Sequence, residues 1–321
     1  MGEALAIAAL TMFSVNIIIT KVASVRLNLH FGFLISVAVN VLFGALLFGG
    51  QLLIRQGGLQ WNSSGFLLFL VAGFFSTYLG RWFFFDSIAK LGPAKASVFQ
   101  TSNPLFTVII AWIFLNEGLS LLDVIAIGMI LLGLFLTSYV PGAFSKPSPI
   151  ATGYEPFETP ERMGRFAALR NITPGMIFRS GIFLGVIGAV SYAAGNVLRG
   201  AAVQTWNEPI LGGLIGASVG LVLHFFTSSN TRHFWGLLKS ADRRGLLLYI
   251  LSGITTITGQ ICVIASFWYM PVSLANLISL STPILVTPMS YFLLRNQEGI
   301  TLRTIFGSTL VLSGITIILL V

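Results

Sequence analysis

Long apolar runs alternate with short polar segments along the whole chain. A membrane-spanning helix needs roughly 20 mostly apolar residues, and about ten segments satisfy this requirement. The pattern therefore predicts an all-α integral membrane protein. Its ten transmembrane helices are expected at about 3–20, 31–54, 65–85, 96–116, 121–140, 177–199, 207–228, 245–269, 272–294 and 301–321.

The second half of this pattern repeats the first. One stretch begins at Pro93, ends at Pro104 and is followed by an apolar run and the turn Asn116-Glu117-Gly118. A later stretch ends at Pro283 and leads in the same way to Gln297-Glu298-Gly299. Internal repeats in apolar chains are typical of two-fold transporters. With five helices per copy, the copies must cross the membrane in opposite senses. We therefore predict two inverted five-helix repeats, at 1–140 and 177–321, joined by a flexible basic linker at 141–176.

The composition excludes a water-soluble protein. Charged residues make up 9% of the chain and hydrophobic residues 55%, and the mean hydropathy is +0.90. Soluble domains carry about 25% charged residues. The net charge of +8 comes from bases in loops, so it indicates orientation in a membrane and not nucleic-acid binding. The single Cys262 cannot form an internal disulfide and is expected to pack within a helix.

The loop charges predict the orientation. Odd-numbered loops hold 15 of the 18 Lys and Arg residues, whereas even-numbered loops hold only Arg55 and Arg199, and Arg81 lies inside the third helix. Basic residues collect on the cytoplasmic side of membrane proteins. This distribution places both termini outside the cytoplasm, in a plasma or bacterial inner membrane.

Together these motifs resemble the EamA-type ten-helix transporters of the drug/metabolite transporter (DMT) superfamily. The resemblance rests on Phe13-Ser14-Val15-Asn16, on residues 88–97, on the two proline spacings and Glu-Gly turns, and on Gly133 and Gly314. It implies that the repeats surround a central cavity and carry a small organic metabolite, such as an amino acid, a nucleoside or a drug-like solute. Family members mostly place both termini in the cytoplasm. Here the loop charges point the other way, and we follow the charges.

Polar side chains deep in the apolar helices mark the expected substrate site. Such groups avoid hydrocarbon by facing the bundle interior or a wet cavity, although they can also bond a neighbouring helix. Aligning Gly80 with Gly259, and Pro104 with Pro283, puts polar residues of both halves at equivalent positions. The predicted substrate-binding residues are Arg81, Gln100, Asn103, Asn16, Tyr78, Asn196, Gln260, Asn276 and Ser279.

Arg81 and the two prolines have specific predicted roles. A guanidinium pairs well with a carboxylate or phosphate, so Arg81 could be the counter-ion of an anionic substrate. It could also reach the nearby membrane interface or pair with Asp86. Pro104 and Pro283 each remove a backbone hydrogen bond, which predicts bends that act as gates in the fourth and ninth helices.

The sequence contains no pair of carboxylates, Cys/His cluster or phosphate-binding loop, so neither enzyme activity nor a metal or cofactor is expected. No carboxylate falls well inside a predicted helix, which favours a facilitator, exchanger or exporter over a proton-driven carrier. The predicted function is secondary transport of a small molecule by alternating access, as a monomer or homodimer in the lipid bilayer. A membrane-embedded lipid-modifying enzyme and a channel are the alternatives.

Overall fold

A computed structural model describes residues 1–27, 29–55, 58–91, 102–138, 181–227, 241–293 and 302–320, together with Gly236 and Leu238. The predicted linker at 141–176 and the predicted site residue Gln100 lie outside these ranges. The described residues form helices and no strand. By length and composition, six of these helices can cross a membrane: Gly2–Ser24, Phe31–Ile54, Ser63–Phe84, Gly181–Thr205, Pro209–Thr227 and Arg243–Ser266. Shorter apolar helices accompany them.

The helices of the first half follow the apolar runs. They are α1 (Gly2–Ser24), α2 (Leu29–Ile54), α3 (Ser63–Gly73), the π-helix η1 (Phe74–Gly80), α4 (Arg81–Leu91), α6 (Asn103–Phe114) and α7 (Leu121–Ser138). Local sequence fixes some of the starts. The side chain of Asn62 accepts a hydrogen bond from the backbone N–H of Gly65 at 2.9 Å and so caps α3.

The second half contains α9 (Gly181–Thr205), α10 (Pro209–Thr227), α12 (Arg243–Ser266), α13 (Val272–Leu280), α14 (Pro283–Leu293) and α15 (Leu302–Leu320). Asp242 caps α12 by accepting from the backbone N–H of Gly245 at 3.0 Å. This bond, helped by the backbone of Arg244 and by the nearby Arg26, holds the pKa of the Asp242 carboxyl below its usual value.

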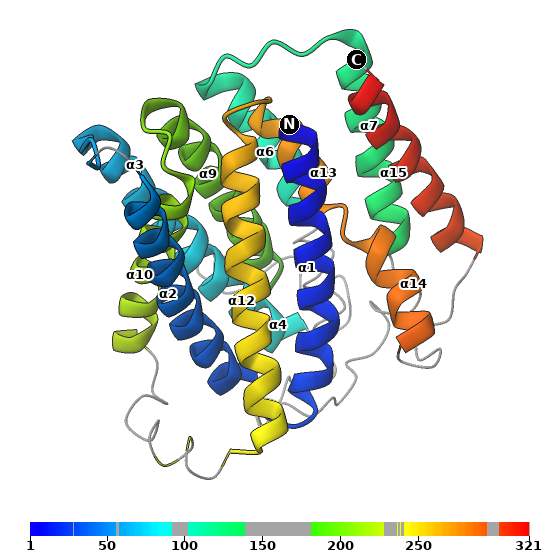
Figure 1. The fold of residues 1–321 in the computed structure, drawn as a ribbon. Coiled ribbons are helices and arrows are strands. Elements are labelled where there is room, and N and C mark those ends of the chain that lie inside the picture. Colours follow the sequence, from blue (N-terminus) through cyan, green and yellow to red (C-terminus); the bar gives the residue numbers. More distant parts are fainter. Residues whose placement is uncertain are drawn as a thin grey trace, which may run out of the picture.

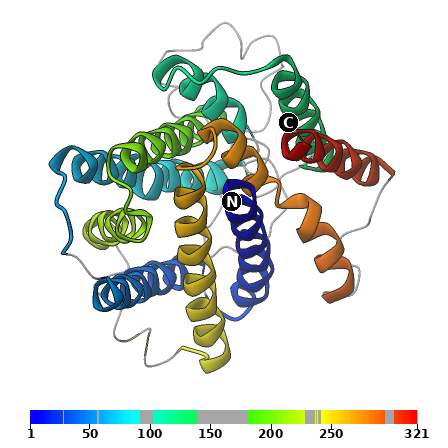
Figure 2. The same cartoon turned by 45° about the horizontal axis from the view of Figure 1, so that its top comes forward.

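Helices of one half pack mainly on helices of the other. α1 packs on α12 and α13, and α2 packs on α10 and α12. The continuous segment of α3, η1 and α4 packs along α9, and α6 lies against α9 and α13. α7 and α15 form a pair at one edge of the molecule (Figures 1 and 2). The hydrophobic core therefore lies between the two halves of the chain.

Glycines allow two of these helix pairs to approach closely. A Cβ atom added at Gly73 would lie 2.8 Å from the Cα of Gly216, which fixes the contact of α3 with α10. A Cβ atom added at Gly314 would lie 2.9 Å from the carbonyl oxygen of Ala126, where α15 crosses α7. Small residues at such contacts let membrane helices gain van der Waals packing.

Candidate functional site

The third apolar segment changes its hydrogen-bond pattern halfway along. Between α3 and α4 lie the seven residues of η1. Where η1 ends, the backbone N–H of Arg81 donates to the carbonyl of Tyr78, and not to the carbonyl of Thr77 that would be its α-helical partner. π-Turns inside α-helices occur frequently at functional sites. This one lies against α9.

Thr77 uses both of its oxygens to contact other helices. Its hydroxyl accepts a hydrogen bond from the Nη2 group of Arg199, in α9, at 3.3 Å. Its carbonyl oxygen lies 3.1 Å from the Nε2 atom of His224, in α10. A carbonyl only accepts, so the Nε2 atom of His224 must carry the proton. Thr77 lies inside the π-turn, which thus holds this carbonyl beside the histidine.

Arg199 is buried inside α9. The residue is only 4% exposed, and its Nη1 group donates to the Oδ1 atom of Asn196 at 3.2 Å. The sequence-based placement of Arg199 in an even-numbered loop is therefore wrong. α9 continues to Thr205, beyond the predicted end at 199. The prediction failed because polar residues interrupt the apolar run there, whereas buried hydrogen bonds keep these residues inside the bundle.

A chain of amide and hydroxyl groups leads from α9 to α13 and then to α6. Asn196 donates from Nδ2 to the Oδ1 atom of Asn276 at 2.8 Å, and Asn276 donates from Nδ2 to the hydroxyl of Thr107 at 2.9 Å. The hydroxyl of Thr107 lies 3.1 Å from the backbone carbonyl and from the Oδ1 atom of Asn103. None of these four residues is more than 8% exposed. The chain thus joins a helix of the first half to two helices of the second.

We refer to the connected residues Thr77, Asn103, Thr107, Asn196, Arg199 and Asn276 as the central network. Sequence reasoning predicted its three asparagines and missed Thr77, Thr107 and Arg199. Helical spacing could have found two of them: Asn103 and Thr107 are four residues apart, and Asn196 and Arg199 are three apart, so each pair shares a helix face.

Arg81 lies close to this network but bonds differently. Its guanidinium carbon stands 4.0 Å from the ring centroid of Phe33, in a cation–π contact. Among the described residues its guanidinium forms no ion pair with Asp86. The neighbouring Gly80 faces the ring of Tyr192, whose Cγ atom would lie 3.0 Å from a Cβ atom added at the glycine.

Tyr78 packs in an aromatic group beside the network. Its ring makes edge contacts with His224, at 5.2 Å between centroids, and with Trp82, at 5.4 Å. The His224 ring also makes an edge contact with Phe33, at 5.1 Å. Tyr78 is 7% exposed. Through Phe33, which also contacts Arg81, these rings connect to the guanidinium.

The remaining predicted site residues have other partners. Asn16 accepts a 2.6 Å hydrogen bond from the hydroxyl of Ser252, which links α1 to α12. Ser279 donates to the carbonyl of Ala275 within α13 at 2.7 Å. Gln260 is partly buried on α12. Within the described part of the chain, no hydrogen bond that we identify connects these three residues to the central network.

Both predicted gate prolines stand at helix starts. Pro104 is in the first turn of α6, and Pro283 is the first residue of α14. A proline in the first turn loses no intrahelical hydrogen bond. The ninth apolar segment divides into α13 and α14 between Leu280 and Pro283, where turn hydrogen bonds link the two helices. The prediction that Pro283 bends a continuous helix is corrected, because Pro283 begins the second helix. Pro288 lies inside α14.

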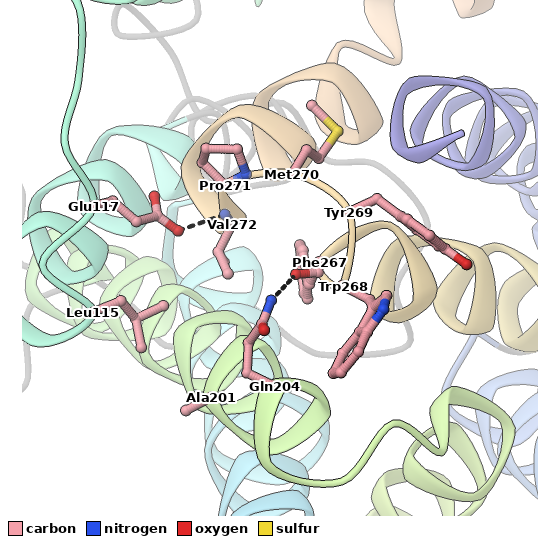
Figure 3. Close-up of a pocket in the computed structure, with 10 residues that line it drawn as sticks. All are labelled: Leu115, Glu117, Ala201, Gln204, Phe267, Trp268, Tyr269, Met270, Pro271 and Val272. Atoms are coloured by element: carbon pink, nitrogen blue, oxygen red, sulfur yellow. Dashed lines mark hydrogen bonds between the residues drawn. The ribbon is translucent and has the colours of Figure 1, made fainter.

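A cavity of about 490 Å³ lies beside the start of α13, near the N-terminus of the chain (Figure 3). Gln204 crosses one side of it and donates to the carbonyl of Phe267 at 2.7 Å. Glu117 borders another side and accepts hydrogen bonds from the first backbone N–H groups of α13. Val272 lines the cavity, and Asn276 of the central network follows one turn later in α13.

One carboxylate is buried near a helix end. Glu208 is 3% exposed, directly before α10, and forms an ion pair with Arg55 and a 3.3 Å hydrogen bond with Gln51. Glu208 precedes the first residue of α10, at the helix end where the sequence analysis placed it, and Arg55 neutralises it. In the part of the chain that the structure describes, no group of three or more His, Cys, Asp and Glu residues could hold a metal ion.

Comparison with known proteins agrees with this architecture. No curated protein matches the chain. Among 28 matching solved chains, one described as "Crystal structure of protein" is 14% identical, with a TM-score of 0.66. The match covers 99% of this chain and 96% of that one, which establishes a shared fold. The sequence model of the EamA-like transporter family matches residues 1–139 and 179–320. This multi-pass integral membrane protein therefore belongs to the EamA-like transporter family.

Proposed function

We propose that the protein is a secondary transporter that moves a small organic metabolite by alternating access between two inverted five-helix repeats. The observation that carries this proposal is the hydrogen-bond chain from Asn196 through Asn276 to Thr107. It joins helices of both halves at a buried, polar position. In inverted-repeat transporters the substrate site lies at the interface of the repeats, near the middle of the membrane.

Helix packing supports the two-fold arrangement. If residues 1–138 and 181–320 are equivalent, α1 corresponds to α9, and α12 to the segment of α3, η1 and α4. The contact of α1 with α12 then corresponds to the contact of α9 with that segment, and both are extensive. Likewise α2 packs on its own equivalent, α10, and α7 packs on α15.

One pair of side-chain contacts supports the same symmetry. The ring of Tyr192 lies over Gly80, and the ring of Phe13 lies over Gly259. The alignment that equates the two glycines also equates Tyr192 with Phe13. The same ring-over-glycine packing therefore occurs at both equivalent interfaces.

Saturable counterflow in proteoliposomes tests the proposal. Vesicles loaded with unlabelled amino acids, nucleosides, organic acids or drug-like solutes should accumulate the labelled form of at least one of them. Protein-free vesicles are the control. Flux that never saturates would indicate a channel, and conversion of a labelled lipid to a product would indicate an enzyme. Either result would contradict the proposal.

A further inference from the structure

The two equivalent interfaces differ in charge. We call the contact of η1 and α4 with α9 the α9 interface, and the contact of α1 with α12 the α12 interface. The alignment of Gly80 with Gly259 places Arg81 opposite Gln260 and Arg199 opposite Thr20. Two arginines on the α9 interface thus correspond to an amide and a hydroxyl on the α12 interface. Helix packing alone does not require these charges, because the α12 interface is built without them.

Arg199 has neutral hydrogen-bond acceptors. Its guanidinium donates to the amide oxygen of Asn196 and to the hydroxyl of Thr77. A guanidinium carries five N–H donors, which is more than these two acceptors use. Gly216 lies beside the guanidinium, since a Cβ atom added there would stand 3.5 Å from the Nη2 atom. Arg199 therefore keeps donor capacity for another acceptor.

Carboxylates do not neutralise these arginines in the described part of the chain. The ion pairs found there are Arg26 with Asp242, Arg55 with Glu208, and the terminal amine with Glu3. All three are at helix ends. A buried charge without a counter-ion is costly, and in membrane helices such residues commonly mark a substrate or ion pathway.

Arg81 and Arg199 both lie near Tyr192. The ring of Tyr192 lies over Gly80, the residue before Arg81, and Arg199 donates to Thr77, four residues before Arg81. Tyr192 and Arg199 are seven residues apart in α9, so they share a helix face. The face of the bundle around Tyr192 therefore combines two positive groups with a hydroxyl donor, within an apolar wall that includes Phe33 and Tyr78.

We propose that the substrate is an organic anion whose carboxylate or phosphate group binds between Arg199 and Arg81, beside Tyr192. This inference rests on the proposed transport function and names its substrate class. Arginine suits such groups because its planar fork gives two parallel hydrogen bonds to an oxyanion. The bound anion supplies the counter-ion that Arg81 and Arg199 do not find among the described carboxylates. The aromatic wall accommodates the apolar part of the substrate.

Matched pairs of compounds test the charge requirement. The midpoint of thermal unfolding of the full-length protein in detergent is measured with benzoate and benzamide, glutamate and glutamine, and glycerol 3-phosphate and glycerol. At least one anion should raise the midpoint while its neutral partner does not, and the responding pair tells carboxylate from phosphate. No response to any of these anions, or an equal response to the neutral partners, would overturn the inference.

Variants assign the response to the two arginines. R199Q and R81Q should each raise at least tenfold the concentration of anion needed for half of the stabilisation. R26Q is the matched control, because the Arg26 side chain is exposed and already has Asp242 as its ion-pair partner. If R199Q does not fold, R81Q still gives the test. Unchanged anion binding in a folded R199Q or R81Q protein would contradict the site.

Counterflow then separates this inference from the proposed function. Saturable exchange of neutral or cationic solutes alone would overturn the anion site and leave the transporter intact. Anion binding that requires both arginines, without exchange of any solute, would support the anion site and contradict the transport function. The expected result is exchange of the stabilising anion, and loss of that exchange in R199Q.

Discussion

Glu117 accepts two hydrogen bonds from Ser273, one from its hydroxyl at 2.5 Å and one from its backbone N–H at 3.2 Å. The preceding Val272 donates its backbone N–H to the same carboxylate. α13 begins after Pro271, which provides no side-chain cap. The Glu-Gly turn of the first half thus caps a helix of the second half. Asn116 allows the turn, because its φ of 53° is a conformation that asparagine tolerates.

Removal of this cap should destabilise the protein. We expect E117A to lower the free energy of unfolding by about 1–2 kcal/mol, since it leaves N–H groups at a helix start without an acceptor. Thermal unfolding in detergent measures the effect. E3A is the control, because the Glu3 side chain is 45% exposed and its ion pair is with the neighbouring terminal amine. Equal midpoints for E117A and the wild type would show that the cap contributes nothing.

Asn276 should be essential for transport. Its side chain accepts from Asn196 and donates to Thr107, so N276A breaks the central network at two points. We expect the initial uptake rate to fall at least tenfold, which corresponds to about 1.4 kcal/mol of activation free energy. The variant should still insert into the membrane normally. The N196A and N276A changes should be strongly non-additive in combination, because they share one hydrogen bond.

T309A provides the comparison for this series. The hydroxyl of Thr309 is exposed and bonds only the carbonyl of Ile305 in its own helix. Its uptake should equal that of the wild type. Strictly additive losses in the N196A/N276A double variant would show that the two asparagines act separately.

The π-turn should be required for transport and not for folding. A π-helical ring holds one more residue than an α-helical ring, so deletion of Phe75 lets α-helical bonds run through this region. The carbonyl of Thr77 would then turn with the helix and lose its contact with His224. We expect uptake to fall at least tenfold while the protein elutes as a single species in size-exclusion chromatography. Deletion of Ser148, in the predicted central linker, is the control, and wild-type uptake by the Phe75 deletion would refute the prediction.

Arg55 should stabilise the protein by neutralising a buried carboxylate. In R55Q the side chain of Glu208 stays buried without its ion-pair partner, which should cost about 1–3 kcal/mol in unfolding free energy. The additional change E208Q should restore much of the lost unfolding free energy. R26Q should have a smaller effect, below about 1 kcal/mol, because both members of that pair are exposed. A double variant as unstable as R55Q would show that charge is not the cause.

The orientation in the membrane stays a prediction and can be measured directly. The structure brings the N-terminus and the end of α15 to the same end of the molecule (Figure 1). The loop charges place that end outside the cytoplasm. A reporter fused after Val321 that is active only outside the cytoplasm should therefore be active. Activity of a cytoplasmic reporter at this position would show that the loop charges do not set the orientation.

The placement of the helices was largely predictable, because membrane helices follow runs of apolar residues. The third and ninth segments show the limits of this pattern. Periodicity does not distinguish the π-turn at Phe74–Gly80 from an α-helix, since both keep the run apolar. The interruption before Pro283 was read as a bend, since a proline fits either a kink or a new helix start.

The sequence by itself determined that the chain is apolar enough to enter a membrane, where its helices lie and that its two halves share motifs, because these depend on local composition and order. It also identified Asn103, Asn196 and Asn276, because amides deep in apolar runs need polar partners. Only the tertiary structure decided which groups become those partners. Thr77 and Arg199 are 122 residues apart in the chain, and their contact exists only because η1 packs along α9. The same packing buries Arg199, which composition alone had assigned to a loop.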